Sequence, residues 1–362
     1  MRNKLYAVVL LLGATATVSS CKDDDAGTPV KPYTVPTTYS FANANYTKST
    51  QRVKMLLELD TYLKTAHGNT GGSVIALDGA KVANMWANTN NPFADASLNT
   101  SGVNIKDATA DAALYKLYAD SVSIYNTLTP AVPGTGGWIA RNTGKIIIGP
   151  RGLEYGQSFL KGTMGGFLFK EAVRILTAVK SVSATDTTTA QKSWDEAFGY
   201  LAVPANYDSS VAYVNTDPNR PLHWGGYLRE RGRGIQAGGI IFGAFLKGRA
   251  AIGGYDVTVR NAQVDIILAK WEQLAAAAAF EYVTAPTRAS SVGNPATQFH
   301  ALSEGFGFIA SLKYRAANSK LSAANYTILS NIINKDFYAL VSQPGFTDLV
   351  QAQNILKTTY GL

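Results

Sequence analysis

The sequence contains almost no cysteine: Cys21 is the only one in 362 residues. A second thiol is needed for an intramolecular disulfide, and several are needed for an iron–sulfur cluster or a thiolate zinc site, so all of these are excluded. Charged residues are also few, at 16%, whereas 46% of the residues are hydrophobic, which is typical of a globular protein. Beyond residue 21 no apolar run reaches the roughly 20 residues that a membrane-spanning helix requires.

Motifs for catalysis and for nucleic-acid binding are also missing. The chain has no Gly-x-Ser-x-Gly elbow and no His-Glu-x-x-His pair, and its glycine clusters lack the Gly-Lys-Ser/Thr ending of a phosphate-binding loop. The net charge of +8 comes from basic residues that are scattered along the chain, so no nucleic-acid partner is expected. We therefore predict a protein that is not an enzyme. A metallopeptidase, which needs a metal ion with an open coordination position, is the least favoured alternative.

The first residues have the pattern of a secretory signal peptide. Arg2 and Lys4 precede an apolar stretch at residues 5–12, and small residues lead to Cys21. This arrangement predicts a signal peptide at 1–20, lipidation of Cys21, and a proline-containing flexible tether at 21–39. The Lys-Asp-Asp-Asp sequence after Cys21 resembles the export signal of surface lipoproteins in Bacteroidota, although it also suits a solvated spacer. The expected location is the outer membrane, with a lipid anchor and surface exposure.

Most of the remaining sequence shows the periodicity of helices. Apolar residues recur at helical spacing in several segments, and Ala275 to Ala279 form the strongest local helix signal. The predicted helices include residues 50–67, 107–128, 152–179, 190–201, 235–251, 257–282, 296–314, 322–340 and 346–360. Residues 145–148 are the one good strand candidate, and 205–227 are expected to form a loop. We predict an all-α domain at 40–362 with long irregular loops, in which Gly162, Gly165 and Gly166 permit close helix packing.

A short internal repeat suggests duplication. Residues 194–201 (WDEAFGYL) align with residues 302–309 (LSEGFGFI), with Glu, Phe, Gly, an aromatic and an aliphatic residue in the same order. Each copy is expected early in a helix, after a polar loop. The repeat predicts two related helical bundles, at approximately 40–204 and 205–362.

The candidate site is built around the two equivalent glutamates of the repeat, Glu196 and Glu304. His300 and Glu304 are four residues apart, so they share one face of a helix and could ligate one metal ion or form a hydrogen-bonded pair. Glu196 is the equivalent of Glu304, with Lys192 at the position of His300. Glu154 and Gln157 share a face of the long glycine-rich helix and could join them.

Two interpretations of this set remain open. In one, the residues form a buried polar network that holds the helices in register, with Lys161 and Arg249 neutralising the carboxylates. In the other, they line a pocket for a cation or small ligand, with a metal ion or haem as the candidate cofactor.

The other two histidines and one arginine cluster can be interpreted without a ligand. His67 is expected to cap a helix end and is given no function. His223 lies in the predicted loop and is interpreted as a surface contact. The cluster of Arg229, Arg231 and Arg233 is better explained by a solvated loop than by a site for an anionic ligand.

Several blocks resemble a lipoprotein family of Bacteroidota known as domain of unknown function 4856. They are residues 39–41, 51–55, 91–93, 152–155, 194–200, 246–251 and 300–305, and the Trp-Asp-Glu-Ala and Leu-Ser-Glu-Gly blocks are the most specific. The family often has a histidine where this chain has Lys192. More distantly, the repeated helical blocks look like imelysin-like proteins, although here the His-to-Glu spacing is four rather than the three of their Gly-x-His-x-x-Glu motif.

These resemblances imply a helical surface lipoprotein that is a binding component accessory to the uptake of iron, haem or another metal species. Its partners would be the membrane, through the lipid anchor, and an outer-membrane uptake receptor. The alternative is a structural or protein-interaction lipoprotein with no small-molecule ligand, which would have an exposed aromatic patch as its functional surface.

Overall fold

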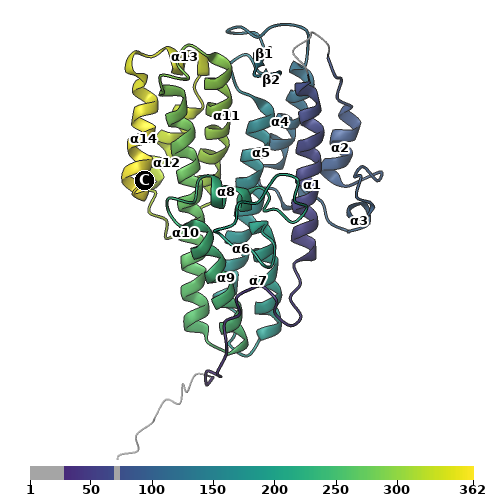
Figure 1. The fold of residues 1–362 in the computed structure, drawn as a ribbon, viewed down its shortest axis with the longest axis vertical. Helices are drawn as coiled ribbons and strands as arrows, with labels where there is room; N and C mark the ends of the chain where they lie inside the picture. The colour runs from purple at the N-terminus through teal and green to yellow at the C-terminus, as the bar shows by residue number, and fades with distance from the viewer. Residues whose placement is uncertain (1–27, 69–73) are drawn as a thin grey trace, which may run out of the picture.

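Long helices that run roughly along one axis dominate the computed structural model, which describes residues 28–68 and 74–362 (Figure 1). The only sheet in these two ranges is a two-stranded hairpin at one end. The predicted all-α class is therefore confirmed. No helix in the described ranges combines the length and the apolar character required to cross a membrane.

The first part of the chain forms four helices and the hairpin. Its elements are α1 (Thr47–Lys64), the 3₁₀ turn η1 (Thr65–His67), α2 (Gly79–Ala87), α3 (Ala96–Asn99), η2 (Lys106–Ala108), α4 (Ala112–Tyr125), β1 (Gly137–Arg141) and β2 (Gly144–Ile148). The strands are antiparallel, with Trp138 opposite Ile147. The strand candidate at 145–148 is thus correct, and the sequence pattern missed its partner because β1 is less apolar and only partly buried.

The glycine-rich segment forms one continuous helical rod with an irregular centre. It consists of α5 (Tyr155–Thr163), a π-helical turn η3 (Met164–Phe169) and α6 (Lys170–Val179). A π-helical turn disturbs the regular backbone pairing, and two carbonyls here accept bonds from outside the rod. The Trp224 indole donates to the Met164 carbonyl at 2.7 Å, and the Ala110 amide donates to the Gly166 carbonyl at 2.8 Å. The irregularity is therefore compensated by two other segments.

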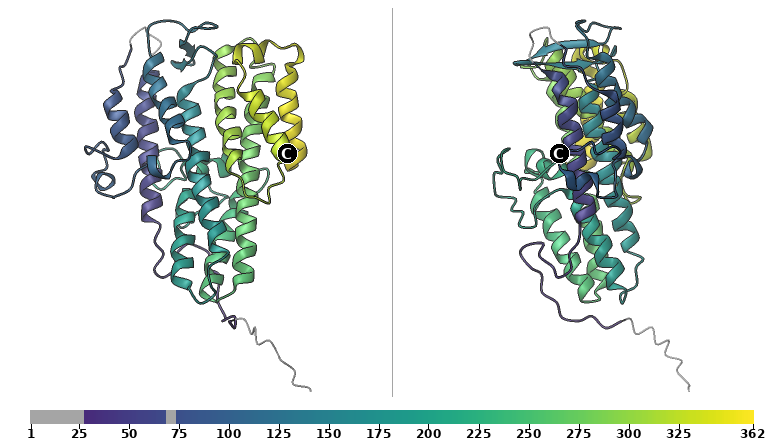
Figure 2. Two further views of the ribbon diagram at one scale, coloured as in Figure 1. Left: turned by 180° about the vertical axis from the view of Figure 1, so that it is seen from behind. Right: turned by 90° about the vertical axis from the view of Figure 1, so that its right-hand side faces the viewer.

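The second part of the chain completes the helical assembly. It contains α7 (Thr187–Leu201), α8 (Trp224–Glu230), α9 (Ala237–Gly253), α10 (Val257–Thr284), η4 (Ala285–Thr287), α11 (Pro295–Ser311), η5 (Leu312–Tyr314), α12 (Ala323–Ile333), α13 (Phe337–Ser342), η6 (Pro344–Phe346) and α14 (Thr347–Tyr360). The 28-residue α10 spans most of the molecule, beside α9 at one end and α11 at the other (Figures 1 and 2). It links the two ends of the assembly.

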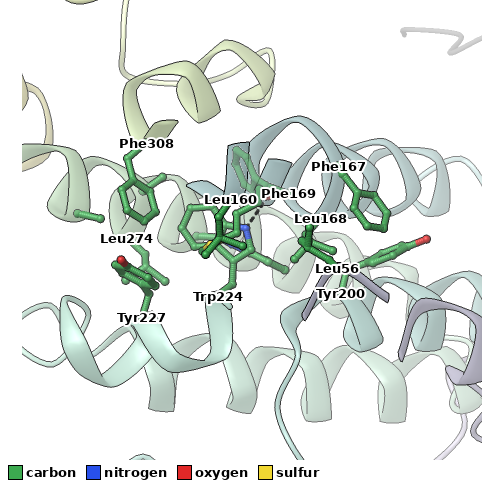
Figure 3. Close-up of a cluster of buried hydrophobic side chains, with 14 of the residues drawn as sticks. Leu56, Leu160, Phe167, Leu168, Phe169, Tyr200, Trp224, Tyr227, Leu274 and Phe308 are labelled. Carbon is green, nitrogen blue, oxygen red and sulfur yellow. Dashed lines mark hydrogen bonds between the residues drawn. The ribbon is translucent and has the colours of Figure 1, made fainter. Parts of the chain in front are cut away.

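A continuous hydrophobic core includes residues from both halves of the sequence. Leu56 of α1, Phe169 of η3, Trp224 of α8 and Phe308 of α11 all belong to it (Figure 3). Trp224 is fully buried and begins a helix, so its expected place in the 205–227 loop is wrong. The predicted division at residue 204 stays a prediction.

The two repeat copies lie late rather than early in their helices. Residues 194–201 are the last eight of α7, and residues 302–309 end two positions before the end of α11. The expected early position is therefore wrong, because α7 begins at Thr187 and α11 at Pro295, and the side chains of Asp186 and Asn294 cap these starts.

The three glycines of the rod do permit close packing. A Cβ added to Gly162 would lie 2.4 Å from Tyr115 Cε1, one on Gly166 would lie 2.5 Å from Tyr115 Cε2, and one on Gly165 would lie 2.1 Å from Ser311 Oγ. No side chain larger than hydrogen fits at these distances, so α4 and the last residue of α11 approach the rod only because glycine is present.

The described part of the predicted tether, residues 28–39, lies against the helical domain. The Lys31 amide donates to the Gly254 carbonyl at 2.8 Å, and the Tyr39 amide donates to the Ala205 carbonyl at 2.7 Å. Tyr39 is buried against Phe198, with parallel rings whose centroids are 3.6 Å apart. The predicted start of the folded domain at residue 40 is thus slightly late, and residues 21–27 lie outside the described residues.

Candidate functional site: a carboxylate–histidine cluster

Three of the five predicted site residues come together in the interior. His300 of α11 contacts Glu154, the residue before α5, with 2.7 Å between Nδ1 and Oε2. Its other ring nitrogen, Nε2, lies 3.4 Å from Glu304 Oε1, one turn further along α11. The carboxylate–histidine cluster, defined as Glu154, His300 and Glu304, thus joins α5 to α11 through one imidazole.

Local structure fixes Glu154 in this position. The preceding Gly152 has φ of +82°, and a Cβ there would lie 2.9 Å from Phe337 Cβ, so glycine is required by both backbone and space. The Glu154 amide donates to Ser303 Oγ at 2.8 Å, which ties the start of α5 directly to α11. With its backbone held in this way, the fully buried Glu154 side chain faces His300.

A chain of polar contacts leads from Glu304 toward the surface. Lys161 Nζ lies 3.9 Å from Glu304 Oε1, and the Tyr227 hydroxyl donates to Glu304 Oε2 at 3.4 Å. The Tyr227 and Tyr282 hydroxyls are 3.0 Å apart, and Arg231 donates to the Tyr282 hydroxyl at 3.2 Å. Arg231 is therefore part of this network rather than of a solvated loop, which corrects the expectation for that arginine.

The electrostatics of the network keep Glu304 ionised. Burial raises the pKa of Glu304, but the positive charges of Lys161 and Arg231, the adjacent His300 imidazole and the Tyr282 hydroxyl outweigh it, so the pKa lies below its usual 4.5. Burial raises the pKa of Tyr227 well above 10, and Glu304 raises it further, so that phenol stays protonated and able to donate. The negative charge on Glu304 thus has stable donors around it.

Two buried side-chain oxygen atoms at the start of α5 have no hydrogen-bond partner among the residues that the structure describes. They are Glu154 Oε1 and Gln157 Oε1, and both belong to predicted site residues. Glu154 has no exposed surface and Gln157 is 7% exposed. An unpaired buried acceptor is costly, about 1–3 kcal/mol and more for a charged group, so this part of the site retains capacity for a donor or a cation.

His67 lies close to the same residues, which the sequence did not indicate. A Cβ on Gly156 would be 3.7 Å from His67 Nε2, so the imidazole faces the first turn of α5. Burial lowers the pKa of His67, although the negative charge of Glu154 raises it. His67 does end a helical segment, at η1, as predicted. No spacing signal links residue 67 to residue 154, because their proximity arises only from how α1 docks beside α5.

The fifth predicted residue, Glu196, lies elsewhere. Its Oε1 is 3.7 Å from Arg52 Nη1 and 3.5 Å from the Tyr200 hydroxyl, and no contact within the described ranges joins it to the cluster. Arg249 pairs with Asp195, at 2.7 Å, and not with a predicted carboxylate. The expectation that Arg249 neutralises the candidate glutamates is therefore wrong, whereas Lys161 does pair with Glu304.

No group of three or more His, Cys, Asp or Glu side chains in the described residues is arranged to hold a metal ion. A metal ion near Glu154 would therefore also require the amide oxygen of Gln157, or water, as a ligand. Among the candidate residues, carboxylate and amide oxygens outnumber imidazole nitrogens. This donor set suits a hard, oxygen-preferring cation better than one that prefers thiolates.

His223 is not the surface contact that the sequence suggested. Its Nε2 lies 3.2 Å from the Val53 carbonyl oxygen of α1, and the side chain is half-buried. Burial lowers the pKa of His223 to about 4, from an ordinary 6.5. The neutral imidazole therefore helps to connect the segment before α8 to α1.

This lowered pKa predicts a loss of stability in mild acid. Because the unfolded chain binds a proton at pH 6.5 and the folded protein only near pH 4, the contribution of His223 is complete above pH 6.5 and decreases as the pH falls toward 4. At pH 5 the expected loss is about 2 kcal/mol. Urea unfolding at pH 7.5 and pH 5 measures it, and His223→Gln is expected to reduce the difference. If the stability difference between the two pH values were unchanged in His223→Gln, His223 would not be its source. Part of the difference should persist in the variant, because the pKa of His67 is also lowered.

The fold and the site together define a class: an all-α protein in which one imidazole between two buried carboxylates joins the central helices. The chain belongs to the family described as Domain of unknown function (DUF4856), whose model matches residues 36–359. This confirms the resemblance to that domain family, whereas the Bacteroidota lipoprotein assignment and the more distant similarity to imelysin-like proteins stay predictions. No curated protein and no solved structure matches the chain.

Proposed function

We propose that this protein is a lipid-anchored binding protein of the outer-membrane surface, accessory to metal uptake, in which the carboxylate–histidine cluster receives a cation. The observation that carries this proposal is that two buried acceptors, Glu154 Oε1 and Gln157 Oε1, have no partner in the described part of the chain. Two acceptors without a donor favour a positively charged ligand over an anion. A hydrated divalent cation requires few protein ligands, and it would satisfy these oxygens directly or through its bound water.

Access to the cluster is available through His300. Its side chain is 18% exposed, whereas Glu154 is completely buried behind it. The imidazole bridges the two carboxylates, so rotation of this one side chain would open both to an incoming cation. His300 then acts as a replaceable occupant of the site, and Lys161 compensates the charge of Glu304 while the imidazole moves.

The lipid anchor is supported by the sequence around Cys21 and by where the domain begins. Lys31 is bound to Gly254, at the end of α9, which lies at the end of the molecule opposite the β1–β2 hairpin (Figure 1). An anchor at Cys21, ten residues earlier in the sequence, would hold that end toward the membrane and leave the hairpin end facing away from it.

Elemental analysis and metal titration of the tag-free mature protein test the cation site. Iron, calcium, magnesium and zinc are added singly, with haem in a parallel absorption titration. We expect one cation per chain, with affinity reduced at least tenfold in Glu154→Gln. Glu281→Gln is the matched control, because Glu281 forms a surface ion pair with Arg288, at 2.6 Å, outside the cluster. Circular dichroism confirms that each variant is folded, and a folded wild-type protein that binds no metal would refute the proposal.

A structural role is the second candidate, and the completeness of the rest of the network favours it. His300 already contacts both carboxylates, and the contacts join α5, α8, α10 and α11 without any ligand. The accompanying expectation of an exposed aromatic patch is wrong for the described residues, whose strongly exposed large side chains are aliphatic, such as Ile124 and Leu128. Under this alternative, Glu154→Gln lowers stability and no cation binds to either protein.

A further inference from the structure

A large open cleft lies away from the carboxylate–histidine cluster. Its volume is about 1020 Å³, and it is bordered by the first turn of α1, residues 97–101 and the first half of α7. None of the three cluster residues lines it. Lys192 and Glu196, the repeat positions that correspond to His300 and Glu304, both do. The equivalent positions of the two repeat copies thus lie in different environments: His300 and Glu304 are in the interior, and Lys192 and Glu196 face this cleft.

The charges in the cleft do not balance. Its two acidic side chains are already paired, Asp195 with Arg249 at 2.7 Å and Glu196 with Arg52 at 3.7 Å. Its two lysines, Lys48 and Lys192, are exposed, and neither has an ion-pair or hydrogen-bond partner in the part of the chain that the structure describes. The charge left for a ligand is therefore positive.

The uncharged lining is rich in hydroxyl and amide groups. The side chains of Gln51, Thr100, Thr188 and Gln191 have no hydrogen-bond partner within the described residues. Tyr46 adds a half-buried ring, which Phe198 supports edge-to-face at 5.1 Å between ring centroids. Free donors and acceptors around one supported aromatic ring complement a ligand with many hydroxyl groups and at least one apolar face.

We propose that this cleft binds an anionic saccharide. The ligand's negative group, a carboxylate or a phosphate, would pair with Lys48 and Lys192, and its hydroxyls would bond to the threonine and glutamine side chains. A ring face would rest on Tyr46. The volume exceeds what a single inorganic anion would fill and is of the size that holds a short oligosaccharide. This site is independent of the proposed cation site, since the two share no residue.

Isothermal titration calorimetry with the mature protein tests the proposal. The probes are trigalacturonate, glucose 6-phosphate, neutral maltotriose and inorganic phosphate. Saturable binding is expected for trigalacturonate or glucose 6-phosphate, which distinguishes a carboxylate from a phosphate as the charged group. Maltotriose and inorganic phosphate are expected to bind at least tenfold more weakly, because each lacks one half of the required chemistry.

Variants connect the binding to the cleft. Lys192→Ala and Lys48→Ala should each weaken the bound anionic saccharide at least fivefold, and Thr188→Val should weaken it with the charge unchanged. Lys357→Ala is the matched control, an exposed lysine on α14, outside the cleft, and is expected to have no effect. The proposal is overturned if neither anionic saccharide binds, if inorganic phosphate or maltotriose binds as tightly, or if Lys192→Ala leaves the affinity unchanged.

Discussion

Replacing Arg249 with methionine is expected to lower the free energy of unfolding by about 3–5 kcal/mol, the range for removing one partner of a buried ion pair. Arg249 is 3% exposed and Asp195 is 1% exposed. The guanidinium donates to Asp195 through Nε at 2.7 Å and Nη2 at 3.4 Å. The variant leaves a buried carboxylate whose remaining donors, within the described residues, are the Tyr39 hydroxyl and the Asn45 backbone amide. Urea unfolding followed by circular dichroism at pH 7 gives the difference.

The matched control is Arg288→Met, which removes an equally well-formed but more exposed ion pair. Arg288 contacts both carboxylate oxygens of Glu281, at 2.7 and 2.6 Å, yet its side chain is 49% exposed. Solvent screening limits such a pair to about 0–1 kcal/mol. If both variants lost the same small amount, burial would not be the cause of the Arg249 effect. The double variant Arg249→Met/Asp195→Asn should recover part of the loss, because it removes the unpaired charge.

The helices themselves follow closely from periodicity. The pattern at residues 257–282 corresponds to α10 (Val257–Thr284), and the pattern at 190–201 corresponds to the greater part of α7. Local signals determine such elements, because a repeated apolar face and a capping side chain act within a few residues. The sequence pattern did not predict the π-helical turn inside the 152–179 helix. Its stability depends on Trp224 and Ala110, which are distant in sequence.

From the sequence, only those site residues that lie on the same helix could be predicted to meet, because the helical repeat alone fixes which of them share a face. His300 and Glu304 share a face because they are four residues apart, and both reach the same cluster. Glu196 was expected in the interior, but its neighbour Asp195 is the buried residue of the pair. Successive residues point about 100° apart around a helix, so a one-residue error moves a side chain from the core to the surface. The docking of α7 against α9, which places Asp195 beside Arg249, is not encoded in any local pattern.

Replacing Gly307 with alanine is the second change with a large expected effect. Gly307 is where α11 crosses α5, and an added Cβ would lie 2.4 Å from Lys161 Cβ and 2.6 Å from the Gly162 backbone nitrogen. Because one of these atoms belongs to the backbone, a side-chain rotation cannot relieve the clash and the two helices must separate. The expected loss in the free energy of unfolding is about 3 kcal/mol, the upper end for overpacking in a core.

Gly243→Ala provides the matched control, because an added Cβ on this helical glycine of α9 meets nothing within 4 Å. Alanine there should raise stability by about 0.5–1 kcal/mol through backbone entropy alone. Separation of α11 from α5 in Gly307→Ala would also lengthen the His300–Glu154 contact, since these side chains join the same two helices. A Gly307→Ala protein that is as stable as wild type would show that the two helices can shift apart at no cost. One that is less stable but still folded should bind cations more weakly, because the cluster depends on the close approach that Gly307 permits.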